Sequence, residues 1–142
     1  MDIRKITGDY FVSPQITEAD VKALSEQGFR TIICNRPDGE APDQPAFADI
    51  ATEARALGLT TLHVPISGYA ASKDDIAAVQ KALTEAPKPI LAFCRTGTRS
   101  AVLWSLAQAD KMPLDDILDA TGAAGYDLAP VLQNILGAGA AN

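Results

Sequence analysis

The sequence is poor in the residues that build metal centres and disulfide frameworks. Its 142 residues include only two cysteines, Cys34 and Cys94, and a single histidine, His63. Two widely separated cysteines lack the paired spacing of a zinc site and are too few for a disulfide scaffold. We therefore expect no metal and no cofactor, so any chemistry has to come from the side chains themselves.

Long apolar runs and an excess of positive charge are also missing. No segment approaches the roughly 18 apolar residues that a membrane-spanning helix needs, and the first residues lack the apolar stretch of a signal peptide. The 18 acidic residues outnumber the 12 lysines and arginines, giving a formal net charge of −6, which argues against a nucleic-acid partner. We expect a soluble, cytoplasmic protein that binds neither membranes nor nucleic acids.

Short apolar runs alternate with segments of helical spacing along most of the chain. The predicted strands cover residues 3–6, 10–13, 31–35, 60–64 and 89–93, and the predicted helices cover residues 17–28, 47–57 and 72–87. The first two strands flank Thr7-Gly8-Asp9, which is typical of a hairpin at a sheet edge. Alternating strands and helices predict an α/β fold with a central, mainly parallel sheet flanked by helices.

The C-terminal third is predicted to be helical. Pro113 separates its first two helices, residues 122–125 separate the second from the third, and the last helix carries a continuous apolar stripe that begins at Leu128. Residues 137–142 contain only glycine, alanine and asparagine, which have little to bury. We predict a single domain of residues 1–136 and a flexible tail of residues 137–142.

The segment Cys94-Arg95-Thr96-Gly97-Thr98-Arg99-Ser100 joins the last predicted strand to a helix. In such a loop successive backbone N–H groups can point at one spot, and the helix N-terminus adds partial positive charge. Both effects favour a thiolate over a thiol, so we predict that Cys94 is a catalytic nucleophile rather than a packed core residue. The guanidinium of Arg99 can hold two oxygens of an anion, although a surface ion pair is the simpler alternative.

The other loop residues are predicted to complete an anion-binding loop, which comprises Arg95, Thr96, Gly97, Thr98 and Ser100. The Arg95 side chain can face either the anion or solvent. Ser100 can cap the following helix or donate its hydroxyl to the Cys94 sulfur. For Cys34, inside an apolar strand, we favour packing over a role as a resolving cysteine.

Ligands of parallel sheets bind beyond the carboxyl ends of the strands. The loops at residues 35–44, 65–71 and 94–99 lie at such ends and should line one cleft. Its candidate acids and cleft residues, besides the Cys94 loop, are Arg36, Asp38, Glu40 and Ser67. Asp38 and Glu40 can equally serve ordinary turn chemistry, because they flank Gly39. His63 ends a strand and is more simply structural than a general base.

Four segments together resemble the phosphatase-like domains related to those fused to β-lactamase-like hydrolases, some of which are described as sulfur transferases. They are the residues at 10–16, 35–40, 63–66 and 94–100. The resemblance implies a protein-tyrosine-phosphatase-like fold of the dual-specificity type, with Cys94 as nucleophile and Arg99 as oxyanion ligand. It also implies a functional link to a metallo-β-lactamase-like hydrolase.

The chain departs from true tyrosine phosphatases in three ways. Four residues instead of five separate Cys94 from Arg99, which is the loop length of rhodanese-type sulfurtransferases. Ser67-Gly68 stands where the phosphatases carry an acidic Asp, and Phe93 replaces the usual His before the cysteine. Sulfane transfer suffers less from a missing acid, because sulfite or a low-pKa thiolate departs without a proton.

Our leading prediction is therefore a cysteine-dependent, rhodanese-like sulfurtransferase that takes sulfur from a small anionic donor and carries it as a Cys94 persulfide. The first alternative is a phosphatase that forms a Cys94 phosphocysteine from a phosphorylated substrate and takes its acid from Asp38 or Glu40. The second alternative is a non-catalytic anion-binding or redox-sensing module.

Overall fold

Five strands form one sheet, in the order β1-β2-β5-β3-β4. The computed structural model describes residues 1–140. The strands are β1 (Arg4–Thr7), β2 (Tyr10–Ser13), β3 (Thr31–Cys34), β4 (Thr60–His63) and β5 (Ile90–Phe93). β1 pairs antiparallel with β2, whereas all other neighbours are parallel. The predicted α/β fold, with a mainly parallel sheet and an N-terminal edge hairpin, is confirmed.

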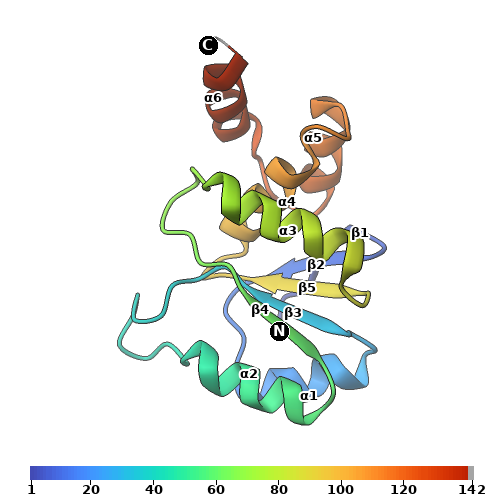
Figure 1. The fold of residues 1–142 in the computed structure, drawn as a ribbon, viewed down its shortest axis with the longest axis vertical. Coiled ribbons are helices and arrows are strands. Elements are labelled where there is room, and N and C mark those ends of the chain that lie inside the picture. Colours follow the sequence, from blue (N-terminus) through green and yellow to red (C-terminus); the bar gives the residue numbers. More distant parts are fainter. Residues whose placement is uncertain (141–142) are drawn as a thin grey trace.

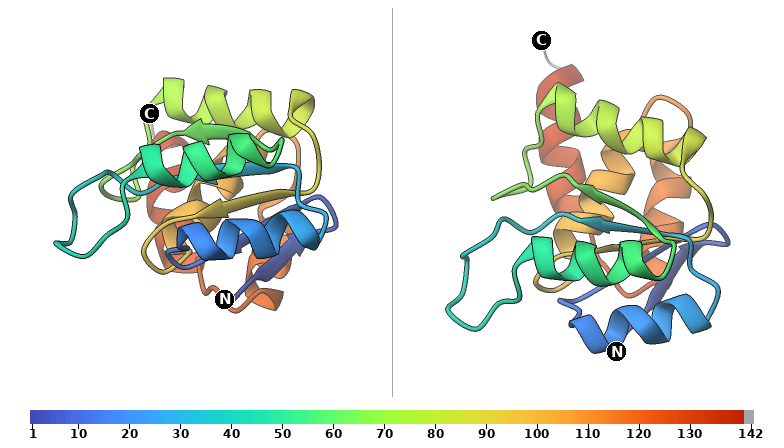
Figure 2. Two further views of the ribbon diagram at one scale, coloured as in Figure 1. Left: turned by 90° about the horizontal axis from the view of Figure 1, so that it is seen from below. Right: turned by 60° about the horizontal axis from the view of Figure 1, so that its bottom comes forward.

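Helices cover both faces of this sheet (Figures 1 and 2). One face is covered by α1 (Glu18–Glu26) and α2 (Phe47–Ala56). The other carries α3 (Lys73–Glu85), α4 (Thr98–Gln108), α5 (Leu114–Ala123) and α6 (Ala129–Ala140). The predicted tail began at residue 137, but α6 continues to Ala140, and positions 141 and 142 lie outside the described residues. No helix of the described chain is long and apolar enough to cross a membrane.

Local signals in the sequence fix where two of the helices begin. The Thr17 hydroxyl accepts a hydrogen bond from the Asp20 N–H, and the Asp20 carboxylate accepts one from the Thr17 N–H. Ser72 and Asp75 form the same reciprocal pair at the start of α3. Each box satisfies two backbone donors that the first helical turn leaves without partners, which fixes the helix start.

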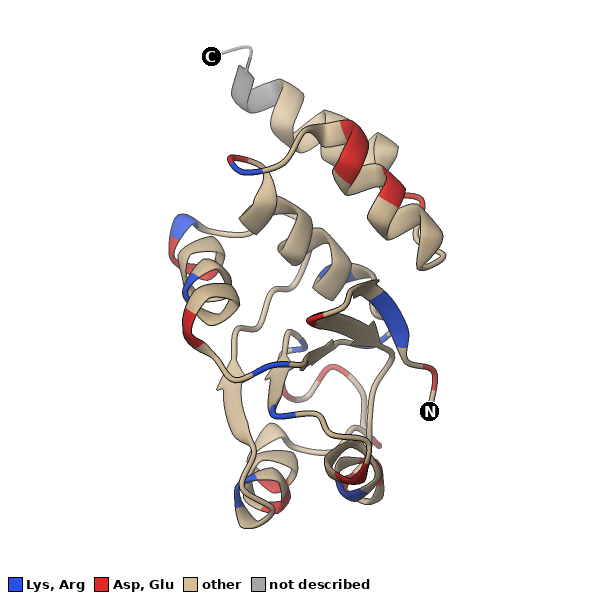
Figure 3. Ribbon diagram, turned by 90° about the vertical axis from the view of Figure 1, so that its right-hand side faces the viewer, with Lys and Arg blue, Asp and Glu red and all other residues tan. Residues whose placement is uncertain are grey.

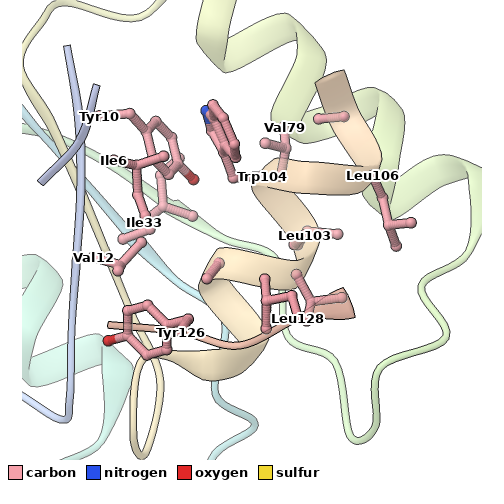
Figure 4. Packing of buried hydrophobic residues seen from close by; sticks show 14 of the residues in the cluster. Ile6, Tyr10, Val12, Ile33, Val79, Leu103, Trp104, Leu106, Tyr126 and Leu128 are labelled. Carbon is pink, nitrogen blue, oxygen red and sulfur yellow. The ribbon is translucent and has the colours of Figure 1, made fainter. Parts of the chain in front are cut away.

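Helix α4 runs through the middle of the larger apolar cluster, and Figure 4 shows Leu103 and Trp104 of this helix packed there. Every residue from Ser100 to Ala107 is buried, as expected for a helix that is covered on all sides. The Trp104 ring lies 6.5 Å from the ring of Tyr10 on β2. The residues just before α4 are therefore attached to one of the most rigidly packed elements of the domain.

Candidate active site

The loop between β5 and α4 begins at Cys94, whose side chain is buried, and ends at Gly97. The N–H of Gly97 donates a hydrogen bond to the Cys94 sulfur over 3.1 Å. Gly97 has a φ of +90°, a left-handed conformation that glycine adopts far more readily than other residues. The loop thus turns at least one backbone donor onto the sulfur at the N-terminus of a buried helix.

Neighbouring backbone holds this loop at the end of β2. The Cys94 N–H donates to the Ser13 carbonyl over 3.4 Å, and the Gln15 N–H donates to the Arg95 carbonyl over 3.3 Å. The Thr98 N–H donates to the Thr96 hydroxyl over 3.4 Å. Helix α4 begins at Thr98, so Ser100 lies inside it and does not cap it, which was one of the two roles that the sequence left open for Ser100. Its buried hydroxyl has no hydrogen-bond partner among residues 1–140.

Arg99 connects the Cys94 loop to the other two predicted cleft loops. Its two terminal nitrogens donate to the two carboxylate oxygens of Glu40 over 2.6 and 2.8 Å, and one of them also donates to the Ile66 carbonyl over 2.8 Å. The Arg99 side chain is only 11% exposed. Its fork is therefore held in place and binds both oxygens of one carboxylate, the bidentate geometry typical of arginine.

Glu40 lies between two guanidinium groups. The Nε of Arg36 donates to Glu40 over 2.8 Å, and a terminal nitrogen of Arg36 donates to the Gln15 side chain over 3.1 Å. Hydrogen bonds from Arg99, and then from Arg36, lower the pKa of Glu40 to about 2. At neutral pH Glu40 is therefore ionised and has no proton to donate. Asp38 accepts the Phe47 N–H over 2.9 Å at the start of α2, a contact that neither the acid role nor the turn role had predicted.

The ion pairs of Glu40 should make the stability of the protein depend on pH in a defined window. The folded pKa of about 2 lies below the ordinary value of 4.5, so this stabilisation is complete above pH 4.5 and lost as the pH falls towards 2. We expect Glu40→Gln to be less stable than wild type at pH 6, with the difference shrinking across that window. Urea unfolding at several pH values measures the free energy of unfolding of both proteins. A difference between them that stays constant from pH 6 to pH 2 would contradict this prediction.

The three predicted cleft loops do line one cavity, of about 680 Å³. It is lined by Arg36, Glu40, Ala41, Pro42, Ser67, Gly68, Tyr69, Arg95, Thr96, Thr98 and Arg99. Acidic residues are spread over the helices of this protein, as the red bands of Figure 3 show, whereas three arginines and a single acidic residue, Glu40, line the cavity. The cavity is therefore suited to an anion despite the negative net charge.

The remaining cysteine and the histidine have structural surroundings. The Cys34 thiol donates to the Arg36 carbonyl over 3.3 Å, and burial raises the pKa of Cys34 to about 12. The His63 ring stacks on Phe47 at 4.4 Å, with its Nε2 3.1 Å from the same Arg36 carbonyl. Both side chains thus support the backbone under the first cleft loop, as the sequence favoured.

Two residues at the site were not singled out from the sequence. Gln15 fixes Arg36 through its side chain and the Cys94 loop through its N–H. The Tyr126 hydroxyl donates to the Thr96 carbonyl over 3.3 Å. Both contacts join segments far apart in the chain, so no local spacing pattern could have identified them.

Comparison with known proteins gives one family. The model of the phosphatase-like domain of β-lactamase hydrolase-like proteins matches residues 2–111. A β-lactamase hydrolase-like protein of Agrobacterium fabrum is 39% identical over 112 residues, which are 78% of this chain and 26% of that protein. One from Xylella fastidiosa is 32% identical over 130 residues, 90% of this chain and 30% of its own length. The chain thus spans less than a third of the curated relatives it matches.

Solved structures are similar over the whole domain. A protein of Neisseria meningitidis, provisionally described as a phosphatase, is 37% identical with a TM-score of 0.82, covering 95% of this chain and 96% of that one. The catalytic core of a PP-IP phosphatase from S. cerevisiae has a TM-score of 0.67 at 18% identity, covering 96% and 84% of the two chains. At that identity the likeness concerns the fold alone, and it agrees with the predicted phosphatase-like architecture.

Proposed function

Because the chain belongs to the phosphatase-like domain family of β-lactamase hydrolase-like proteins, we propose that it hydrolyses phosphate monoesters through a phosphocysteine on Cys94. The observation that carries this proposal is the loop that joins Cys94 to the cavity. The Gly97 N–H donates to the buried Cys94 sulfur, and the residues that flank these two, Arg95, Thr96, Thr98 and Arg99, line the cavity. A nucleophile beside preorganised donors is the arrangement that phosphoryl transfer requires.

The chemistry follows from these positions. The Cys94 thiolate attacks phosphorus, an S–P bond forms, and the P–O bond to the substrate breaks with its electron pair leaving on oxygen. Arg99 binds two of the phosphoryl oxygens and loop amides bind the rest, which offsets their charge. Water then attacks the phosphocysteine, releasing inorganic phosphate and restoring the thiolate. To bind the oxygens, Arg99 exchanges its contact with the Glu40 carboxylate for one with the phosphoryl group.

The leaving group receives little help from the protein. Ser67-Gly68 lies at the cavity where an acid would be expected, Asp38 is engaged at the start of α2, and Glu40 is ionised. A missing acid costs about 10²- to 10⁴-fold when the leaving oxygen needs a proton. We therefore propose that aryl phosphates, whose phenolates leave unprotonated, are hydrolysed far faster than alkyl phosphates.

The relatives support the phosphatase alternative better than the sulfurtransferase that the sequence analysis preferred. The descriptions of the matching family and of the relatives named above do not mention persulfide chemistry. Three sequence features favoured sulfur: the four-residue spacing between Cys94 and Arg99, Ser67-Gly68 in place of an acid, and Phe93 before the cysteine. The name shared by the curated relatives leads us to propose that this domain works beside a β-lactamase-like hydrolase.

A side-by-side mass measurement tests the proposal. The protein is incubated with p-nitrophenyl phosphate or with thiosulfate and quenched in acid. After proteolytic digestion, the mass of the peptide that contains Cys94 is measured by mass spectrometry. We expect phosphoryl mass on Cys94, together with steady release of phosphate. Sulfur-atom mass from thiosulfate, with no phosphate release from the aryl ester, would overturn the proposal in favour of sulfur transfer.

A further inference from the structure

Tyr126 contacts the Cys94 loop from the turn between α5 and α6. It lies beyond residues 2–111, the part of the chain that the family model matches. Its ring is buried in the larger apolar cluster, and Figure 4 shows the hydroxyl pointing away from Leu128. The Tyr126 N–H donates to the Thr121 carbonyl over 3.0 Å, which fixes the backbone of the turn.

The Tyr126 hydroxyl binds one end of a peptide group whose other end binds the nucleophile. It donates to the Thr96 carbonyl over 3.3 Å. The N–H of Gly97, which belongs to the same peptide group, donates to the Cys94 sulfur over 3.1 Å. In a trans peptide the C=O and N–H point in opposite directions. A donor that holds the carbonyl outward therefore holds the N–H inward, towards the sulfur, and polarises it.

The Tyr126 hydroxyl also packs closely against Gly97 of the Cys94 loop. A Cβ built on Gly97 would collide with the Tyr126 hydroxyl. Only glycine leaves room for this approach, and only glycine readily adopts the φ of +90° found here. The close contact limits how the Thr96–Gly97 peptide can rotate, which adds to the constraint from the hydrogen bond.

A residue on the edge strand holds the tyrosine ring in turn. The guanidinium of Arg4 lies 5.6 Å from the centre of the Tyr126 ring, within the range of a cation–π contact. One of its nitrogens donates to the Ala124 carbonyl over 3.0 Å. Arg4 therefore clamps the turn that carries Tyr126, and this turn is fixed before any substrate arrives.

We propose that Tyr126 is a positioning residue for the reaction: its hydroxyl keeps the Thr96–Gly97 peptide turned so that the Gly97 N–H faces the Cys94 sulfur and the anion formed there. The proposal rests on the proposed function for its effect on turnover. Its effect on the ionisation of Cys94 does not, because a thiolate beside a fixed N–H is stabilised whatever electrophile it attacks. The turn between α5 and α6 thereby contributes a residue to the site.

The test is Tyr126→Phe, which removes one oxygen and keeps the ring. A net hydrogen bond is worth about a factor of 3 to 10 in an equilibrium. We expect the pH midpoint of Cys94 ionisation to rise by about half to one pH unit, and kcat/KM below the midpoint to fall about 3- to 10-fold. The thiolate is measured by its ultraviolet absorbance. The absorbance of the same protein carrying Cys94→Ser in addition is subtracted, so that only the signal of Cys94 remains.

Tyr10→Phe is the matched control. It removes the same oxygen from another buried ring, whose hydroxyl has no hydrogen-bond partner in the described part of the chain. We expect its midpoint and kcat/KM to equal those of wild type. An unchanged midpoint in Tyr126→Phe, or an equal shift in both variants, would overturn the positioning role. If wild type does not hydrolyse aryl phosphate but the shift is specific to Tyr126→Phe, the proposed function fails and the positioning role stands.

Discussion

Replacing Cys94 by serine should lower kcat/KM for an aryl phosphate by at least about 10⁴-fold, because the nucleophile is lost. The two side chains differ by one atom, and the remaining loop donors and Arg99 are untouched. A serine hydroxyl is not ionised at neutral pH, and the carboxylate of Glu40 is engaged with Arg99 and Arg36. Binding of inorganic phosphate should therefore survive while turnover disappears.

Cys34→Ser provides the matched control for this experiment. Its thiol donates to the Arg36 carbonyl, a bond that a serine hydroxyl can also make. We expect this variant to keep its kcat/KM within about threefold, since a packed side chain away from the cavity contributes mainly to stability. Initial rates with p-nitrophenyl phosphate, and calorimetric titration with phosphate, measure both quantities. Turnover that survives in Cys94→Ser would rule out a phosphocysteine.

The fold could be predicted because its signals are local. Two helix starts are indicated by capping boxes that span four residues each, Thr17 with Asp20 and Ser72 with Asp75. Both reciprocal pairs form in the structure. The alternation of strands and helices then allows few topologies. The prediction that three loops share one cleft followed from the parallel part of the sheet, because parallel strands end at the same edge.

The ion pairs of the site could not be predicted in the same way. Arg99 and Glu40 are both polar loop residues in the sequence, and only the folded sheet brings them together. Once paired, Glu40 loses the role of acid that its loop position suggested, because two guanidiniums hold it ionised. Tyr126 was hidden for a similar reason, since it approaches Thr96 from a turn whose sequence shows only helix boundaries.

The predicted reaction class depended on the number of residues between Cys94 and Arg99. That number does not determine the shape of the loop. Four residues between Cys94 and Arg99 match the loop length of rhodanese-type sulfurtransferases and so suggested sulfur transfer. In the structure, Arg99 nevertheless reaches the cavity and holds both oxygens of a carboxylate. A group that binds a planar pair of oxygens can also bind two oxygens of a phosphoryl group. The geometry of Arg99 thus agrees with the family, and the spacing by itself does not decide the chemistry.

Replacing Arg99 by lysine should lower kcat/KM for an aryl phosphate by about 10²- to 10³-fold, the loss typical of one oxyanion donor. Lysine keeps the positive charge but has no planar fork, so it cannot hold two oxygens at once. Because the fork gains most as charge spreads over the phosphoryl oxygens, the loss should fall on kcat more than on KM. Steady-state kinetics separate the two parameters.

Arg55→Lys is the matched control, since Arg55 lies on α2 and its side chain makes one hydrogen bond within the described chain, to the Thr61 hydroxyl over 3.4 Å. It should leave both parameters within about twofold of wild type, as surface substitutions generally do. The Arg99→Lys variant should also raise the pKa of Glu40, whose largest lowering contribution is the hydrogen bond from Arg99. If Arg99→Lys keeps kcat while the Glu40 pKa rises, Arg99 serves only to hold the carboxylate, and the oxyanion is bound by the loop amides alone.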